Sequence, residues 1–280
     1  MLAKSTSALA VFIGTALLSQ AAIAQSCKDQ DFQEQFLTWL KHSRIKLQVP
    51  AKNFVEMSHL TTSREINANT SYIRCKEWPA KAGHRLILAT IPMSEKEAME
   101  NKETFELDAV IFVMNANSQI ASSSPILKKY LYSDGAFLTD VIFDTARYQL
   151  DKNTIAFGIR LGHQVGRWDT FGSISLDLFF ERGSSLLHAL KSIPVYKSSH
   201  NKGINCGAVT EEFNRSLSMA DSKSEGLTNI RVVQKSKTTS ESVSPKEPNI
   251  CIEKVTPEAY RSTTLRFNGS HYEIPSDWTQ

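Results

Sequence analysis

Residues Thr139–Leu190 read TDVIFDTARYQLDKNTIAFGIRLGHQVGRWDTFGSISLDLFFERGSSLLHAL, and this stretch decides the fold class. In the run SISLDLFF, which begins at Ser173, serine and aspartate alternate with apolar residues, as expected for a half-buried strand. Gly183 lies in the short connection to the next apolar run, where glycine adopts a positive φ at little cost. The pattern predicts an antiparallel hairpin over 173–190 and a mainly β protein.

Strand patterns recur on both sides of this stretch. Further strands are predicted at 71–78, 84–92 and 105–114, with a turn at 115–117. Near the end of the sequence, Asn268-Gly269 separates two alternating runs within 263–274, and Asn-Gly is the strongest short-range hairpin signal. An apolar strand, a polar excursion and a hairpin follow one another three times. We therefore predict an antiparallel meander or sandwich, with propeller-like repeats as the alternative.

The third of these units contains a long polar stretch. Residues 234–248 read QKSKTTSESVSPKEP, which is rich in serine, lysine and proline and offers little to bury. Such a composition predicts an exposed, flexible loop.

The amino-terminal residues resemble a secretory signal peptide. Lys4 supplies a positive charge, an apolar run covers 8–18, and Ala22-Ile23-Ala24 has the small side chains of a cleavage site. A membrane anchor is the alternative, but this run is shorter than a membrane span requires. We expect residues 1–24 to be removed, leaving an exported chain, periplasmic or secreted, with no integral membrane association.

A helical pattern follows the predicted cleavage point. Phe32, Phe36, Trp39 and Leu40 recur at spacings of three and four, and Pro50 prevents continuation. This predicts an N-terminal amphipathic α-helix, packed on the core rather than used for docking. The expected organisation is a helix and connector at 25–58, followed by a β-rich domain at 59–280.

Four cysteines remain after the predicted cleavage, namely Cys27, Cys75, Cys206 and Cys251. An even number in an exported chain predicts two disulfides, because that environment is oxidising. Three pairings are possible, and we favour Cys27–Cys75 with Cys206–Cys251 because each closes a loop within one half of the chain. A metal site is the weaker interpretation, since the spacing lacks a Cys-x-x-Cys pair.

Charge and motifs exclude several function classes. The 32 basic and 29 acidic residues are interleaved and give a net charge of +3, which argues against a nucleic-acid partner. The sequence has no Gly-x-Ser-x-Gly elbow, no His-Glu-x-x-His motif and no phosphate-binding loop. Its seven histidines are scattered. We therefore predict no cofactor, no metal and no assignable catalytic residue.

Two places carry residue types suited to binding. Arg167, Trp168 and Asp169 lie in an apparent hairpin loop, and Trp and Arg dominate binding hot spots. Asp144 and Arg147 lie close together in a predicted strand, where they would either bind a ligand carboxylate or saccharide or form a structural ion pair.

The order of several motifs resembles a group of secreted Gram-negative bacterial proteins to which no activity is assigned. The motifs are LILAT, DTARYQL, AFGIR and LRFNGSHYEIP, and the similarity extends from about Arg85 onward. The resemblance implies a bacterial envelope protein and no particular mechanism.

These features favour a binding module that docks another envelope protein or a cell-wall component through the loop around Trp168. A second hypothesis is a cell-wall hydrolase whose acids, such as Asp140, Asp144 or Asp177, are brought together by folding. A third is a structural envelope protein without a discrete site.

Overall fold

A computed structural model describes residues 54–56, 71–91, 105–117, 119–133, 136–165, 171–203, 205–247 and 249–279. These residues are mainly β, as predicted, and their one helical element is the short 3-10 helix η1, Ser276–Trp278. The strands are β1 (Phe54–Glu56), β2 (Ser71–Glu77), β3 (Arg85–Ile91), β4 (Phe105–Met114), β5 (Ile120–Ser123), β6 (Leu127–Ser133), β7 (Phe137–Gln149), β8 (Ile155–Val165), β9 (Phe171–Arg182), β10 (Ser185–Asn201), β11 (Val209–Ser224), β12 (Leu227–Val243), β13 (Cys251–Val255) and β14 (Ala259–Leu265).

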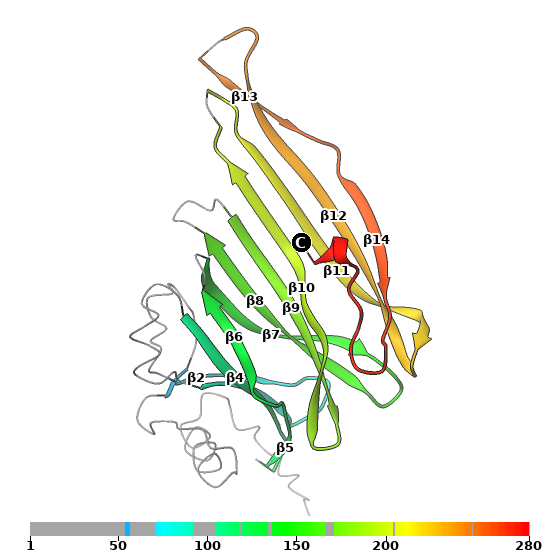
Figure 1. Ribbon diagram of the computed structural model, residues 1–280. Coiled ribbons are helices and arrows are strands. Elements are labelled where there is room, and N and C mark those ends of the chain that lie inside the picture. Colours follow the sequence, from blue (N-terminus) through cyan, green and yellow to red (C-terminus); the bar gives the residue numbers. More distant parts are fainter. Residues whose placement is uncertain are drawn as a thin grey trace, which may run out of the picture.

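All these strands belong to one sheet (Figure 1). Strands β7 to β12 form an antiparallel meander in chain order, and both β13 and β14 pair with β12. Strands β2, β3 and β4 form a second antiparallel run, which β5 and β6 extend along β4. Strands β7 to β12 thus follow the predicted meander pattern, but the parallel pairings of β1 with β2 and of β5 with β10 make the whole sheet mixed rather than antiparallel.

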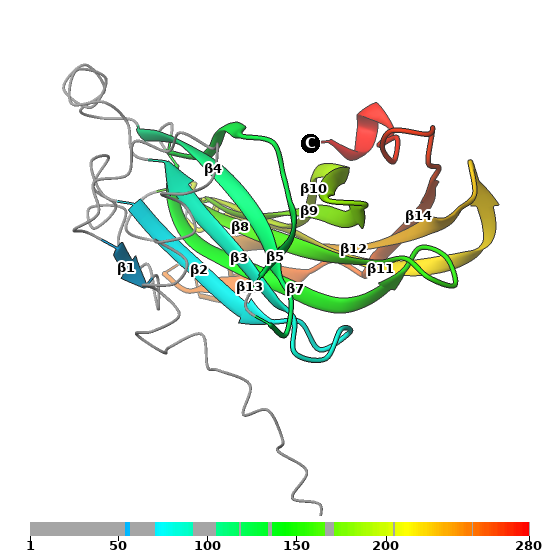
Figure 2. The same ribbon diagram turned by 90° about the horizontal axis from the view of Figure 1, so that it is seen from below.

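The meander has an apolar core on each of its two faces. In the first core, Leu88 of β3 and Ile111 of β4 pack with residues of β7, β8 and β9, including Phe157 and Phe179. The rings of Phe157 and Phe179 stack with centroids 5.9 Å apart. Figure 2 shows β2, β3 and β4 crossing in front of the meander.

The second core lies on the opposite face of the meander. Leu176 and Leu178 of β9 pack there with Ile230 and Val232 of β12 and with residues of the C-terminal segment. That segment crosses this face after β14 and ends in η1, drawn in red in Figure 2. Strand β9 thus contributes side chains to both cores.

Both predicted turns form, and the 173–190 hairpin is confirmed, but the residues after Asn268-Gly269 form only an isolated bridge, Phe267 with Tyr272, and not a strand. Strands β9 and β10 are joined at Gly183, whose φ is 64°. Near the C-terminus, the backbone N–H groups of Ser270 and His271 donate to the Asn268 side-chain oxygen, and Gly269 has a φ of 94°. A positive φ beside an Asn is what an Asn-Gly turn requires.

The structure differs from our expectation of a loop over 234–248. Strand β12 continues to Val243, and the turn occupies only the residues before β13 begins at Cys251. Along one edge of this polar stretch, residues 234–240 pair with β11; along the other, residues 234–236 pair with β14 and residues 239–243 pair with β13. Its threonines have high β propensity, and a strand exposed on both faces needs no apolar alternation.

The predicted signal peptide at 1–24 and the predicted amphipathic helix that carries Phe32, Phe36, Trp39 and Leu40 lie outside the described residues. In the described ranges, no helix is long and apolar enough to cross a membrane.

The Cys206–Cys251 disulfide is confirmed, with a Cα–Cα distance of 5.2 Å. It ties the loop between β10 and β11 to the start of β13. Cys75 of β2 is also a disulfide cysteine, and its predicted partner Cys27 lies outside the described residues.

Removal of this disulfide should destabilise the fold. Its cysteines are 45 residues apart in sequence, and in the chain-entropy model closing such a loop stabilises by about 4 kcal/mol. We expect the Cys206→Ser/Cys251→Ser double variant to unfold at a lower urea concentration than the oxidised parent. An unchanged midpoint would show that the ladders alone hold β13 in place.

Candidate binding site

The predicted loop residues Arg167, Trp168 and Asp169 lie outside the described residues. The strands on either side are described, and their ends, Val165 and Phe171, pair with each other. Phe171 also pairs with Ser199, near the end of β10. The described ends of β8 and β9 therefore lie at the end of the sheet where β10 leads to the disulfide loop.

The structure does not join the other predicted pair, Asp144 and Arg147. The Asp144 carboxylate accepts hydrogen bonds from Arg160 at 2.7 and 2.8 Å and from the Tyr148 hydroxyl at 3.0 Å. Arg147 instead donates to the side chain of Gln149, at 3.3 Å. Asp144 is therefore held in a partly buried ion pair between β7 and β8.

A bulge explains this change of partner. Asp144 pairs with Gly158 and Tyr148 pairs with Ala156, so the three residues between Asp144 and Tyr148 face a single residue of β8. The Asp144 carboxylate also accepts the backbone N–H of Ala146, which closes the bulge. Burial raises the pKa of Asp144, but these hydrogen bonds and the Arg160 charge together lower the pKa below its ordinary value.

The acids of the hydrolase hypothesis are not brought together. Asp177 pairs with Ile159, which belongs to the first core, whereas Asp144 pairs with Gly158, the preceding residue of the same strand. Because successive residues of a strand point to opposite faces, Asp144 and Asp177 lie on opposite faces of the sheet. Asp140 is exposed and lies four residues before Asp144 on β7.

The contacts of Asp177 indicate a structural rather than a catalytic role. The residue is 2 % exposed. Its carboxylate contacts His188 Nε2 at 2.6 Å and accepts the backbone N–H of Ser192 at 2.9 Å and the Tyr130 hydroxyl at 3.2 Å. The His188 ring stacks on Phe179. Burial, followed by the Asp177 charge, raises the pKa of Tyr130 well above its ordinary value. These contacts satisfy a buried carboxylate, as such a group requires.

The exposed end of the meander is a better candidate for binding. We define the distal ribbon as residues 209–213 of β11, 236–243 of β12 and all of β13. None of its residues is buried. It is the upper, projecting part of the sheet in Figure 1. A single layer of sheet has no second layer against which to bury apolar groups.

Apolar side chains are nevertheless found in and beside the distal ribbon. The exposed ones are Val209, Val243, Ile250, Ile252 and Val255. The ladder places Ile252 beside Ser242 and Val255 beside Thr239, so these two side chains point to opposite faces. Among the described strands, β13 has β12 as its one partner, and its other edge is therefore open.

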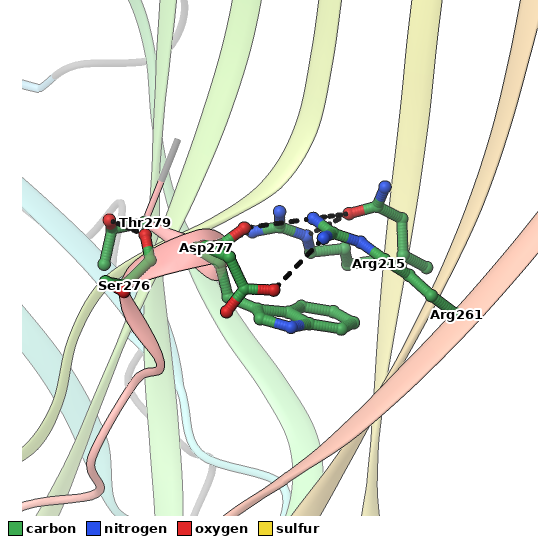
Figure 3. A network of polar contacts seen from close by, with 7 residues as sticks. Arg215, Arg261, Ser276, Asp277 and Thr279 are labelled. Atoms are coloured by element: carbon green, nitrogen blue, oxygen red, sulfur yellow. Dashed lines mark hydrogen bonds and ion pairs between the residues drawn. The ribbon is translucent and has the colours of Figure 1, made fainter.

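A second candidate lies where the distal ribbon joins the second core. Arg215 of β11, Gln234 of β12 and Arg261 of β14 are directly opposite one another. Both arginines donate to the Gln234 side-chain oxygen, at 2.8 Å from Arg215 and 3.1 Å from Arg261. We call this row the arginine slot, and Figure 3 shows the C-terminal residues lying against it.

The arginine slot holds residues 275–279, which we call the C-terminal clip. Arg215 donates to the Trp278 carbonyl at 2.6 Å, and Arg261 donates to the Asp277 carbonyl at 3.2 Å. Arg261 also pairs with the Asp277 carboxylate at 3.3 Å. The guanidinium carbons of Arg215 and Arg261 lie 4.8 and 4.4 Å from the centroid of the Trp278 ring.

The arginine slot is electrostatically unusual because Arg215 is only 5 % exposed. Burial, and next the like charge of Arg261, lower the pKa of Arg215 to about 10, while Asp277 opposes this shift. Sequence reasoning missed the slot, since its three members are far apart in the chain and only the ladders of β12 align them.

No group of three residues able to hold a metal ion is found in the described part of the chain. Comparison with known proteins places the chain in no group: no family model matches it, and no curated protein or solved structure is detectably similar.

The Asp144 ion pair has a testable pH dependence. The pKa of Asp144 is lower in the folded than in the unfolded protein, so the carboxylate stabilises the fold above the unfolded pKa of about 3.9. This contribution is lost as the pH falls through the folded pKa. We expect Asp144→Asn to cost about 2 kcal/mol at pH 7 and much less at pH 3.

Urea unfolding at both pH values checks this expectation. Asp140→Asn, on the same strand but exposed, is the matched control and should change stability little at either pH. An equal loss for Asp144→Asn at pH 7 and pH 3 would contradict a role for the charge.

Proposed function

We propose that this protein is an exported binding module and that the distal ribbon docks an extended segment of another envelope protein. The observation that carries the proposal is a sheet exposed on both faces that still presents apolar side chains. Ile252 is 43 % and Val255 is 55 % exposed. Apolar side chains on an exposed edge strand favour pairing with a strand of another chain.

The open edge of β13 favours an extended partner. A strand added there receives backbone hydrogen bonds from groups that β12 does not use. Because Ile252 and Val255 point to opposite faces, each face of the added strand would meet one apolar side chain. Glu253 and Lys254 would discriminate among partners by charge, since charged edge residues oppose indiscriminate pairing.

The disulfide supports the same function. A thin sheet with no core of its own loosens easily, and Cys206–Cys251 holds two of its connections together. A rigid edge loses less conformational entropy when a partner docks. The hydrolase hypothesis has no corresponding support, because its acids lie apart.

Site-specific cross-linking tests the proposal. A photoreactive residue is placed at Ile252 or Lys254 of the full-length protein in cells, and at Ser218 of β11, outside the distal ribbon, as the control. Both Ile252 and Lys254 should give a discrete adduct with one envelope protein. An added strand follows the pleat of β13, so the two attachment points in the partner should be two residues apart.

The same cross-linking experiment in a Val255→Asp variant provides a second test. The substitution removes an exposed apolar contact while leaving the ladder intact, and the yield of the adduct should fall at least about tenfold. Attachment to a cell-wall polymer, scattered attachment points, or equal adducts from Ser218 would overturn the proposal.

A further inference from the structure

We propose that the arginine slot is a second binding site, selective for a polypeptide segment with an acidic residue followed by an aromatic one, and that the C-terminal clip occupies it in cis. The distal ribbon is not needed for this inference. The clip is a bound peptide whose contacts with the slot are all present in the structure (Figure 3).

The contacts define the ligand class. The slot recognises two consecutive backbone carbonyls, those of Asp277 and Trp278, through one arginine each. It recognises a carboxylate through Arg261, and it recognises an aromatic ring against which both guanidinium groups lie. Paired cation–π contacts select an aromatic ring over an aliphatic side chain. None of these features requires that the peptide be continuous with β14.

The arginines themselves argue for recognition. The rest of the second core consists of hydrophobic residues, which pack against one another. If the site served only to hold the Trp278 ring in the core, further apolar side chains would be sufficient. Instead, Arg215 is buried, and Gln234 and the Pro194 carbonyl both accept hydrogen bonds from it. Burial of a charge is costly unless it is well paired, so this arrangement favours specificity rather than stability.

Opening of the clip removes Trp278 from the second core but leaves the turn before it in place. Trp278 is the buried residue of η1, whereas Asp277 and Thr279 are exposed. The preceding turn stays anchored independently, because Tyr272 donates its backbone N–H to the Ala189 carbonyl and its hydroxyl to the Thr228 carbonyl. Opening of the clip therefore requires loss of the slot contacts and of one buried ring.

Occupation in cis lowers the affinity for a second peptide. A competing segment binds only when the clip is open, so its apparent dissociation constant is the intrinsic value divided by the open fraction. If the slot is closed in about 99 % of molecules, an external peptide binds about 100-fold more weakly than to an open slot.

The test measures binding of a labelled peptide, PSDWTQ, to the full-length protein by fluorescence anisotropy. Trp278→Ala vacates the ring seat and should bind PSDWTQ at least tenfold more tightly than the unmodified protein does. Asp277→Asn, which removes one exposed ion pair and leaves the core untouched, should give a smaller gain. Tyr260→Ala, on β14 but exposed and outside the slot, is the control and should give none.

Peptide variants test the ligand class. PSDATQ, which lacks the ring, should lose at least tenfold in affinity for the Trp278→Ala protein, and PSNWTQ should lose less. The inference is overturned if neither Asp277→Asn nor Trp278→Ala gains affinity, or if PSDATQ binds as tightly as PSDWTQ. Asp277→Asn alone decides the matter if circular dichroism shows that Trp278→Ala is unfolded.

Discussion

The constraint on which the rest of the structure depends is that β9 is buried on both faces. Phe179 packs into the first core, while Leu176 and Leu178 pack into the second. A strand in this position must have neighbours on both edges and a layer over each face. Strands of the β2–β6 group cover one face of β9, and the C-terminal segment covers the other. Burial on both faces also explains the Asp177 network, since a carboxylate on such a strand needs buried partners.

The sequence predicted those parts of the fold in which local signals agree with tertiary packing. Alternation over 173–190 and the Asn268-Gly269 pair each specify a register by themselves, and both turns form where expected. The prediction of a flexible loop was wrong for residues 234–243, because a polar composition does not by itself indicate that a segment lacks regular structure. A strand held by ladders on both edges needs no apolar side chains, so composition could not reveal it.

The candidate sites were harder to predict, because register determines them. The Asp144–Arg160 pair depends on a bulge of three residues opposite one, which no propensity marks. The arginine slot depends on β12 having β11 on one edge and β14 on the other, so that residues 215, 234 and 261 form a row. The binding surface predicted at Arg167, Trp168 and Asp169 remains a prediction, because these residues lie outside the described part of the chain.

The arginine slot lies at the boundary between core and distal ribbon. Along β12, Ile230 and Val232 face the second core, Gln234 belongs to the slot, and the same face continues through Ser236 and Thr238 into the ribbon. Arg215 is buried at this boundary, and the interaction of a cation with an aromatic ring is stronger when the cation is desolvated. Ser242, which pairs with Ile252, lies on this face as well, so the two proposed sites share one face of β12.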